Sequence, residues 1–246
     1  MILINWECLE EMDKLIAEWV KVDAIICDPP YWTTACKWDS VINFDAMWER
    51  LNKLIKPNWA IVLFGSEPFS SALRMSNIKN YKYDWIWEKT RPTWFSHSKN
   101  MPLKNFENIS IFSKWIIQHI NLTSNRMEYY PQWVRKCNKK VKRTSKWFEW
   151  WMERKSQVNE YIAKLENFPR MVLKIPNEWK TVHPTQKPVA LMEYLIKTYT
   201  NEWETVLDFT MGSGSTILAC KNTNRNWIWI ELDETYFNIA KDRLNS

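Results

Sequence analysis

TVLDFTMGSGSTILACKNTNRNWIWIE, residues 205–231, is the stretch that decides the fold. A short apolar strand, Thr205–Asp208, ends in an acid and is followed by a Gly-Ser-Gly turn and a helix, Gly214–Lys221. A second apolar strand, Trp227–Glu231, also ends in an acid. A strand, a glycine turn, a helix and a strand in this order are typical of a parallel βαβ unit, so we expect an α/β fold.

Elsewhere in the chain, short apolar runs alternate with stretches of helical period, which predicts a mainly parallel sheet with helices on both faces. The other expected strands are Ile2–Asn5, Asp23–Asp28, Ala60–Phe64, Tyr83–Glu88 and Asn108–Phe112, which makes about seven strands in all. The other expected helices are Phe44–Ile55, Pro68–Ser76, Pro188–Tyr199 and Glu234–Leu244. The 246 residues are enough for one such domain, with or without an insert.

The segment 115–180 breaks this rhythm, since it is rich in Asn, Lys and aromatic residues and has one helical stretch, near Glu153–Glu166. Between Lys114 and Lys155, eleven Lys and Arg stand against three Glu, so this window carries +8 while the whole chain carries +6. A basic patch confined to one segment is typical of a phosphate-backbone partner, although a solvated loop without a partner can have the same composition.

Asp28-Pro29-Pro30-Tyr31 directly follows an expected apolar strand and is the strongest local signal in the chain. Two prolines remove two backbone donors and fix φ, so the turn is stiff and its carbonyl groups face outward. An acid, these carbonyls and an aromatic ring form a slot lined with acceptors, at the sheet edge where open α/β folds bind ligands. A planar amino group fits this slot, because its two N–H groups can donate while its ring stacks on Tyr31. An ordinary strand-ending turn is the alternative.

The Gly-Ser-Gly turn after Asp208 indicates a second binding site. Glycines let the backbone approach a ligand closely, and the N–H groups at a helix N-terminus favour an anionic group such as a carboxylate. Glu231 ends the next strand, where an acid commonly accepts hydrogen bonds from ribose hydroxyls. These features predict a nucleoside cofactor. A phosphate loop is disfavoured, because no Gly-Lys-Ser or Gly-Lys-Thr follows.

The segment His183-Pro184-Thr185-Gln186-Lys187-Pro188 precedes an expected helix, with Pro188 at the first turn. Alone it indicates only a helix entry, and a single histidine is more often structural than a ligand or a base. The five cysteines are an odd number without a C-x-x-C pair, which argues against a disulfide framework and a zinc site. We therefore expect no metal.

Taken together, these segments resemble the β class of amino-group DNA methyltransferases, in which the catalytic motif precedes the cofactor motif. Residues 28–31 match the family's D-P-P-Y, residues 183–188 its H-x-T-Q-K-P and residues 208–216 its D-P-F-x-G-S-G-T-T, while Glu231 matches the acid after that loop. The resemblance covers nearly the whole chain except about 115–180, where the family carries its variable target-recognition region. The loop departs from the pattern, since Phe209 replaces Pro, Thr210 an aromatic residue and Ser215 a Thr.

This resemblance implies a Rossmann-like, S-adenosylmethionine-dependent methyltransferase sheet. Its implied parts are a catalytic half, 1–114, a target-recognition insert, 115–180, and a cofactor-binding half, 181–246. The implied catalytic residues are Asp28, Pro29, Pro30 and Tyr31. The implied cofactor-binding residues are Asp208, Phe209, Thr210, Gly212, Ser213, Gly214, Ser215, Thr216, Glu231 and Lys187. The implied acceptor is the N6 amino group of an adenine flipped out of double-stranded DNA, because Asp at the first motif position is typical of adenine enzymes; cytosine N4 is the alternative.

The basic residues of the insert are then expected to contact DNA phosphates. They are Arg135, Lys136, Lys139, Lys140, Lys142, Arg143 and Lys146. Such contacts position a protein on DNA but carry no sequence information, so they do not predict a recognition site. The sequence likewise carries no signal for the oligomeric state, or for a restriction-modification, phage or orphan context.

Two other classes of protein share some of these features. RNA and protein-glutamine methyltransferases have the same sheet, but they usually carry Asn in place of Asp28 and lack a basic insert. A DNA-binding protein with a decayed catalytic site is the non-enzymatic alternative. The longest uncharged apolar run, Trp59–Gly65, is shorter than the ~18 residues of a membrane span, and no secretory leader opens the sequence. We therefore expect a cytoplasmic protein that does not bind membranes.

The chain contains three Gly and eighteen Trp, whereas average usage of ~7% would give about 17 Gly. Tryptophan stands where the family typically has glycine at Trp6, Trp32, Trp59, Trp203 and Trp229, and less strictly at Trp19, Trp94, Trp115 and Trp133. Trp38, Trp48, Trp85 and Trp87 are expected to be ordinary core or motif aromatics. Some bacterial lineages and their viruses read the codon UGA as glycine, and other lineages read it as tryptophan. Our hypothesis is that many of these tryptophans are glycines in the natural protein.

Overall fold

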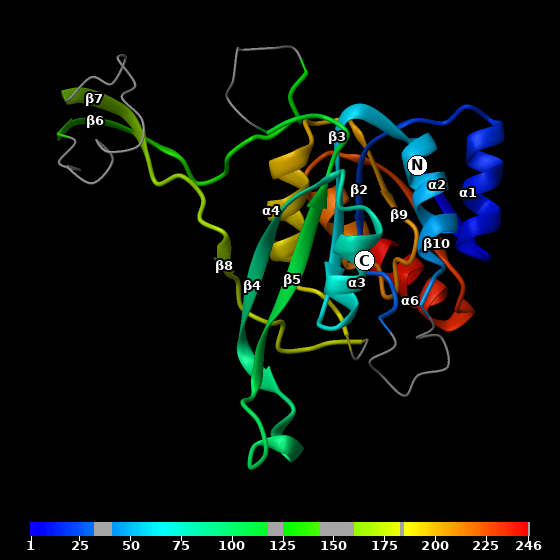
Figure 1. Ribbon diagram of the computed structural model, residues 1–246. Coiled ribbons are helices and arrows are strands. Elements are labelled where there is room, and N and C mark those ends of the chain that lie inside the picture. The colour runs from blue at the N-terminus through cyan, green and yellow to red at the C-terminus, as the bar shows by residue number, and fades with distance from the viewer. Residues whose placement is uncertain (32–40, 118–124, 143–159, 183–184, 246) are drawn as a thin grey trace. The chain divides into compact units, whose positions relative to one another are not determined.

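An eight-stranded sheet forms the centre of the computed structural model, which describes residues 1–31, 41–117, 125–142, 160–182 and 185–245 (Figure 1). Its strand order is β1-β10-β9-β2-β3-β5-β4-β8, and β5 is antiparallel to both neighbours while the other pairs are parallel. The strands are β1 (Ile2–Asn5), β2 (Val22–Cys27), β3 (Ile55–Gly65), β4 (Tyr81–Thr93), β5 (Lys104–Phe112), β8 (Val172–Lys174), β9 (Thr205–Asp208) and β10 (Asn226–Glu231).

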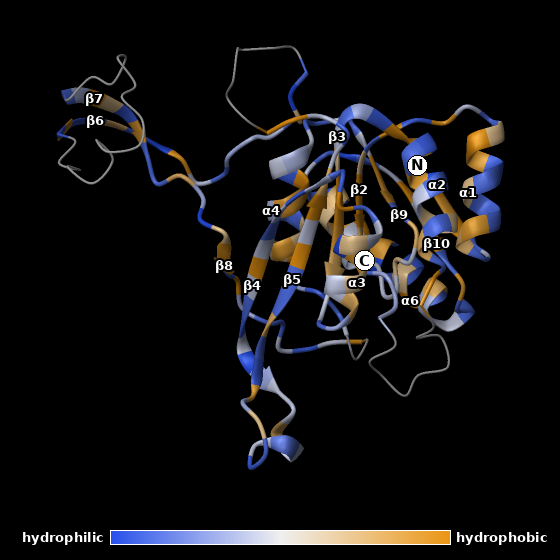
Figure 2. Cartoon of the chain, in the orientation of Figure 1, coloured by the Kyte–Doolittle hydropathy of each residue, from blue (hydrophilic) through white to orange (hydrophobic). Residues whose placement is uncertain are grey.

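Helices cover both faces of this sheet and enclose two hydrophobic cores. The helices are α1 (Cys8–Ala17), α2 (Phe44–Leu54), α3 (Phe69–Ser76), α4 (Val189–Tyr199), α5 (Ser215–Asn222) and α6 (Glu234–Asn245), and a 3-10 turn, η1, spans Phe95–His97. Strand β2 is buried at every position: Ala24 and Ile26 pack in the core with α4–α6, and Ile25 and Cys27 in the core with α1–α3. Figure 2 shows the hydrophobic colouring of these central strands. The predicted α/β sheet with helices on both faces is therefore confirmed.

The C-terminal ends of β2, β9 and β10 meet at one edge of the sheet, because β9 pairs in parallel with both other strands. The chain leaves β2 through α2 toward β3 and leaves β9 through α5 toward β10. The strand order therefore reverses between β2 and β9, and open α/β sheets bind ligands at such a switch point. Asp28, Asp208 and Glu231 end or follow these three strands and lie at this edge.

The expected strands and helices of the sheet are found within a few residues of the expected bounds, apart from the longer β3, β4 and β5. Helix α1 and strand β8 were not expected, nor was the 3-10 turn η1. Helix α1 buries Cys8, Met12 and Leu15 on one face, and this helical spacing is visible in the sequence. The side chain of Glu7 caps the helix by accepting a hydrogen bond from the Glu10 N–H group at 2.9 Å. Strand β8 is three residues long and pairs with β4, too short to give a periodic signal.

Residues Pro131–Arg170 form a second compact unit, separate from the unit of Met1–Tyr130 and Met171–Ser246. Its described part is an antiparallel hairpin of β6 (Arg135–Lys142) and β7 (Glu160–Glu166). The helix expected near Glu153–Glu166 is wrong over 160–166, because cross-strand pairing with β6 overrides the helical propensity of Glu, Ala, Lys and Leu. Residues 153–159 lie outside the described residues. No helix in the described ranges is long and apolar enough to cross a bilayer.

Candidate active site

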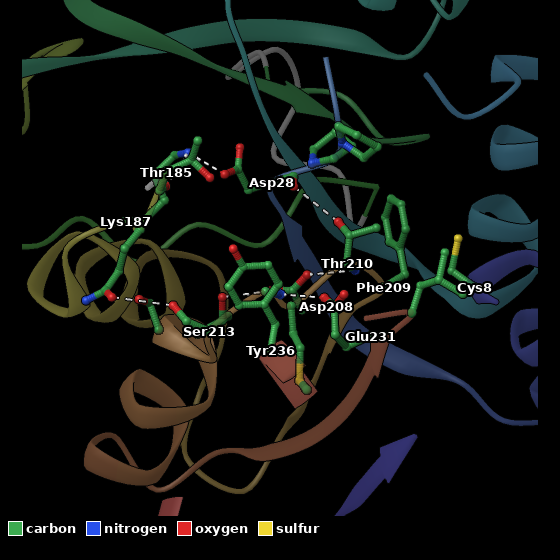
Figure 3. Close-up of a pocket in the computed structure, with 18 of the residues that line it drawn as sticks. Cys8, Asp28, Thr185, Lys187, Asp208, Phe209, Thr210, Ser213, Glu231 and Tyr236 are labelled. Atoms are coloured by element: carbon green, nitrogen blue, oxygen red, sulfur yellow. Dashed lines mark hydrogen bonds and ion pairs between the residues drawn. The ribbon is translucent and has the colours of Figure 1, made fainter. Parts of the chain in front are cut away.

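A cavity of about 200 Å³ opens at the C-terminal edge of β2, β9 and β10 (Figure 3). Its walls come from the Asp28–Tyr31 segment, from Lys187, from the loop after Asp208, and from Glu231. The side chains of Asp28, Thr210, Asp208 and Glu231 gather around it from three neighbouring strands (Figure 3). The two motifs, which lie about 180 residues apart in the sequence, therefore meet in one pocket.

Asp28 lies at the entrance of the loop after β2, and both of its carboxylate oxygens have partners. The Tyr31 hydroxyl donates to Oδ1, and the Lys187 ammonium donates to Oδ2. The Tyr31 ring packs against Phe69 with a centroid distance of 5.1 Å, so the phenol is held in place. Burial raises the pKa of Asp28, and the positive charge of Lys187 opposes part of this rise. Burial and then the charge of Asp28 raise the pKa of Tyr31, which keeps its hydroxyl a donor.

Lys187 is 6% exposed and lies between two acids. Its ammonium contacts Asp28 and is 3.3 Å from Oε2 of Glu107, a residue of β5. Lys89 of β4 donates to the other oxygen of Glu107. Although burial acts in the opposite direction, Lys187 and Lys89 hold the pKa of Glu107 below its usual value, and Asp28 and Glu107 hold that of Lys187 above its usual value. Glu107 was not among the residues expected from the sequence, and its only signal there is an acid before an apolar strand.

The glycine loop leads from β9 into α5. Gly212 and Gly214 have φ of 54° and 79°, in the left-handed region that favours glycine. A Cβ on Gly214 would lie 2.8 Å from Cβ of Ala240 in α6, so this position needs glycine for space as well as for φ. The Gly212 N–H group donates to Oε2 of Glu231 at 2.8 Å, which fixes that carboxylate beside the loop.

Asp208 is 2% exposed and forms hydrogen bonds that fix the glycine loop. It accepts hydrogen bonds from the Thr216 hydroxyl at 2.7 Å and from the Thr210 N–H group at 3.2 Å. Burial raises the pKa of Asp208 to about 7, although these hydrogen bonds act in the opposite direction. Phe209, which replaces the family's proline, is fully buried in the core with α1–α3. Phe209 therefore contributes to the packing beside the pocket.

The hydrogen-bonding groups around the glycine loop that remain available for a ligand suit S-adenosylmethionine. The hydroxyl of Ser215 lies in the pocket wall at the start of α5 and is buried without a hydrogen-bond partner among the described residues. The oxygens of Glu231 each accept one backbone N–H bond, from Gly212 and from Asp233, and can accept more. A buried donor at a helix start and a carboxylate acceptor suit the carboxylate and the ribose of the cofactor.

The structure brings together nearly all residues expected at the two sites. Asp28, Pro29, Pro30, Tyr31, Lys187, Asp208, Phe209, Thr210, Gly212, Ser213, Ser215, Thr216 and Glu231 line the one pocket, and Gly214 supports it from the loop. The five expected DNA-contacting residues Arg135, Lys136, Lys139, Lys140 and Lys142 lie on β6 of the second unit. Arg143, Lys146, His183 and Pro184 lie outside the described residues. No cluster of potential metal ligands is present in the part of the chain that the structure describes.

The strand order of the sheet, the pocket at its switch point and the acids that end its strands are those of a Rossmann-like methyltransferase. The family model described as a DNA methylase, for N6 and N4 amino-group methyltransferases, matches residues 22–242. The chain therefore belongs to this family of S-adenosylmethionine-dependent DNA methyltransferases, as the resemblance predicted.

Several curated relatives match nearly the whole of the chain. The type II methyltransferase M2.LlaDCHI of Lactococcus lactis subsp. cremoris is 25% identical over 276 residues, which covers 99% of this chain and 89% of the relative. M2.DpnII of Streptococcus pneumoniae is 24% identical over 278 residues and covers 100% and 90%. M1.MboII of Moraxella bovis is 27% identical over 256 residues and covers 97% and 94%.

Solved structures agree with this assignment. The complex of M1.HpyAVI with S-adenosylmethionine is 28% identical, with a TM-score of 0.64, and the match covers 99% of this chain and 100% of that one. The cytosine-N4-specific PvuII DNA methyltransferase is 16% identical, with a TM-score of 0.63 and coverage of 97% and 84%, and shows the shared fold alone.

Proposed function

We propose that this DNA methyltransferase methylates the N6 amino group of adenine in double-stranded DNA, with Asp28 as the central catalytic residue. The single observation that carries the proposal is the position of Asp28. Its carboxylate lines the same pocket as Glu231 and the glycine loop, at the switch point of the sheet. An acceptor amine at Asp28 therefore lies beside a cofactor held by the loop.

The chemistry of an exocyclic amine explains why an acid and a carbonyl are needed there. The nitrogen lone pair is delocalised into the ring, so the amine is a poor nucleophile. Hydrogen bonds from its two protons to the Asp28 carboxylate and the Pro29 carbonyl draw the nitrogen toward tetrahedral geometry and free the lone pair. The cofactor supplies an electrophilic methyl group on a sulfonium. The protein contributes orientation and electrostatic stabilisation, without a covalent enzyme intermediate.

A base inside a duplex cannot reach this slot, so the target base has to leave the helix. Tyr31 lies next to Asp28 in the pocket wall and can stack on the flipped base. We propose that Glu231 accepts from the ribose of the cofactor and that the start of α5, with Ser215, receives its carboxylate. The preference for adenine over cytosine is supported by Asp at the first position of the D-P-P-Y motif.

Contacts with the DNA backbone are proposed for the hairpin of β6 and β7. All eight residues of β6, RKCNKKVK, are exposed or partly exposed, and five of them are Arg or Lys. Glu166 and Glu160 of β7 form ion pairs with Arg135, Lys140 and Lys142 at 3.6, 2.8 and 3.5 Å. Lys136 and Lys139 have no acidic partner among the described residues, so their charge is free for phosphates.

Methyl transfer from a labelled donor to unmethylated genomic DNA tests this function. Digestion to nucleosides and mass spectrometry separate N6-methyladenine from N4-methylcytosine. We expect label in N6-methyladenine, and loss of at least 99% of it in Asp28→Ala. Asp242→Ala, an exposed acid in α6, is the matched control and should retain full activity. Label in N4-methylcytosine would overturn the base assignment, and activity that survives in Asp28→Ala would overturn the role of Asp28.

A further inference from the structure

A chain of four charged groups, two of them buried and two partly buried, runs away from the pocket behind Asp28. It consists of Asp28 after β2, Lys187 before α4, Glu107 on β5 and Lys89 on β4, with alternating sign. Lys187 and Glu107 are 6% and 8% exposed. Only Asp28 and Lys187 line the pocket, and Glu107 lies behind them.

The geometry places two carboxylates on one ammonium. Lys187 has a hydrogen bond to Asp28, whereas Oε2 of Glu107 has an ion pair at 3.3 Å but no hydrogen bond. The ammonium also lies 5.8 Å from the ring centroid of Tyr31 and 5.2 Å from that of Phe64, so apolar surfaces exclude water from it. Breaking one contact of such a buried set leaves an uncompensated charge, which is strongly unfavourable.

We propose that Lys187 and Glu107 are positioning residues for methyl transfer: the Lys187 ammonium keeps the Asp28 carboxylate ionised and aimed at the acceptor amine, while Glu107 fixes where the ammonium lies and takes a share of its positive charge. This proposal rests on the proposed role of Asp28. It gives Lys187 a function on the acceptor side of the pocket in place of the cofactor contact expected from the sequence. The charged and titratable groups that face Asp28 are Tyr31, Lys187, Glu107 and Asp208.

Titration of the Asp28 carboxyl in the free protein tests the proposal without relying on activity. The midpoint is followed by NMR of carboxyl-labelled aspartate, and Asp28→Asn identifies the signal. Lys187→Gln removes the positive charge, so the midpoint should rise. Glu107→Gln removes a negative charge and leaves Lys187 to Asp28 alone, so the midpoint should fall. Lys187→Arg keeps the charge and should keep the midpoint near that of the unmodified chain. Shifts of the two Gln variants in the same direction, or no shift, would overturn the proposal.

Kinetics then separate positioning from cofactor binding. In Lys187→Gln, kcat should fall about tenfold for each pH unit by which the Asp28 midpoint lies above the pH of the assay. Lys187→Arg keeps the positive charge and should retain part of the activity that Lys187→Gln loses. The Kd for S-adenosylmethionine, measured by calorimetry, should stay within about twofold. A large rise in this Kd with an unchanged pH profile would return Lys187 to the cofactor site. Absence of methyl transfer in the unmodified chain would instead contradict the proposed function, while the titration would still test how Lys187 and Glu107 affect the ionisation of Asp28.

A second, independent observation concerns the tryptophans. Six non-glycine residues among those described have positive φ, and four of them are Trp19, Trp94, Trp133 and Trp203, at 58°, 70°, 62° and 69°. The other two are asparagines, Asn167 and Asn224, a residue type that tolerates this region. A tryptophan in the left-handed region is a strained exception, and four in one chain call for a common cause.

The end of α1 shows what kind of residue the backbone requires. The Val20 N–H group donates to the Leu15 carbonyl and the Trp19 N–H group to the Ile16 carbonyl, both at 3.0 Å. These two bonds define a Schellman motif, in which the left-handed position, here Trp19, is usually glycine and sometimes asparagine. The end of α5 has the same motif with Asn224 at that position, since Arg225 N–H donates to the Cys220 carbonyl at 3.0 Å.

The side chains at these four positions also contrast with those of ordinary core tryptophans. Trp19, Trp94, Trp133 and Trp203 are 85%, 43%, 57% and 70% exposed. Trp48, Trp85 and Trp87 are buried, and each indole N–H donates a hydrogen bond, to Ser76, Tyr199 and Ile175 respectively. Trp229 is fully buried, but its indole N–H has no partner among the described residues.

We infer that glycine stands at positions 19, 94, 133 and 203 of the natural protein, where UGA codons have been read as tryptophan. Of the positions singled out from the sequence, Trp203 has this backbone signal, and so do Trp19, Trp94 and Trp133 among those that fitted the family pattern less strictly. Trp6, Trp59, Trp115 and Trp229 do not have it, and Trp32 lies outside the described residues. The codons decide the matter directly: we expect UGA at the four positions and UGG at 48, 85 and 87. UGG at the four positions would overturn the inference.

Melting temperatures give a test on the protein itself. Each of Trp19→Gly, Trp94→Gly, Trp133→Gly and Trp203→Gly should raise Tm by about 2–4 °C, because glycine removes the strain. Trp48→Gly is the matched control and should lower Tm, since it empties part of the core and breaks a hydrogen bond. A fall in Tm in all four variants would contradict the inference.

Discussion

The hydroxyl of Thr210 donates a hydrogen bond to the backbone carbonyl of Asp28 at 3.1 Å, and so joins the ends of β9 and β2. The same hydroxyl lies 2.9 Å from the sulfur of Cys27. Thr210 takes the place of the aromatic residue that the family pattern has in this loop. The contact therefore gives the substituted residue a specific structural role: it ties the proposed catalytic motif to the proposed cofactor loop.

Thr210→Val should weaken this connection while keeping the shape of the side chain. One hydrogen bond contributes about 0.5–1.5 kcal/mol, so we expect kcat to fall about 3–10-fold as Asp28 becomes less well held. The Kd for S-adenosylmethionine should change little. Steady-state kinetics with duplex DNA measure the first quantity and calorimetry the second. Thr205→Val, at the start of β9, is the control, and an equal fall in kcat there would contradict the interpretation.

The buried carboxyl of Asp208 predicts a pH dependence of stability. Its pKa is raised from 3.8 to about 7 in the folded chain, so the folded state holds a proton that the unfolded state has lost between these values. The stabilisation by this proton is present below pH 3.8 and is lost as the pH rises through 7. Integrated over this window the loss is about 4 kcal/mol at most. Asp208→Asn removes the effect.

Urea unfolding at pH 5, 6, 7 and 8 checks this prediction without the cofactor. The unfolding free energy of the unmodified chain should fall relative to that of Asp208→Asn from pH 5 to about 7 and level off by pH 8. Asp242→Asn changes an exposed acid and should follow the unmodified chain. Parallel pH curves for the unmodified chain and Asp208→Asn would show that Asp208 has no raised pKa.

Most of the sheet and both motifs could be predicted from the sequence because their signals are local. Strand β2 is apolar at nearly every position, and its alternate residues fill two cores, which is what burial on both faces requires. The Asp28–Tyr31 turn and the glycine loop are continuous segments whose residue types carry the chemistry. Parallel pairing of β2 with β9 then brings them together.

The features that could not be predicted depend on contacts between distant residues. Glu107 belongs to the site only because antiparallel β5 lies between β3 and β4, so that its side chain reaches Lys187. Strand β7 has the composition of a helix and becomes a strand through its partner β6. The left-handed φ of Trp203 is not visible in the residue type itself, and only the family pattern, which has glycine at this position, indicated a turn there.

Gly214→Ala should destabilise the cofactor loop by two separate effects. The alanine would have to adopt a φ of 79°, in the left-handed region, and its Cβ would lie 2.8 Å from Cβ of Ala240. We expect a loss of about 2–4 kcal/mol in unfolding free energy, measured in urea, together with weaker binding of S-adenosylmethionine. Ala240→Gly alone should cost about 1 kcal/mol as a glycine within a helix. The double variant should lose less than the sum, because it removes the collision, and additive losses would contradict this contact as a cause.

Lys136 and Lys139 of the β6 strand should determine much of the salt dependence of DNA binding. Neither has an acidic partner in the described ranges, whereas Arg135, Lys140 and Lys142 each pair with a glutamate of β7. Each phosphate contact contributes about 0.9 to the slope of log K against log salt concentration. Lys136→Gln with Lys139→Gln should therefore reduce the slope by about 2, measured by fluorescence anisotropy from 50 to 200 mM salt. Lys53→Gln with Lys197→Gln removes the same charge elsewhere, and an equal reduction there would show that the effect is one of net charge, not of contact by the hairpin.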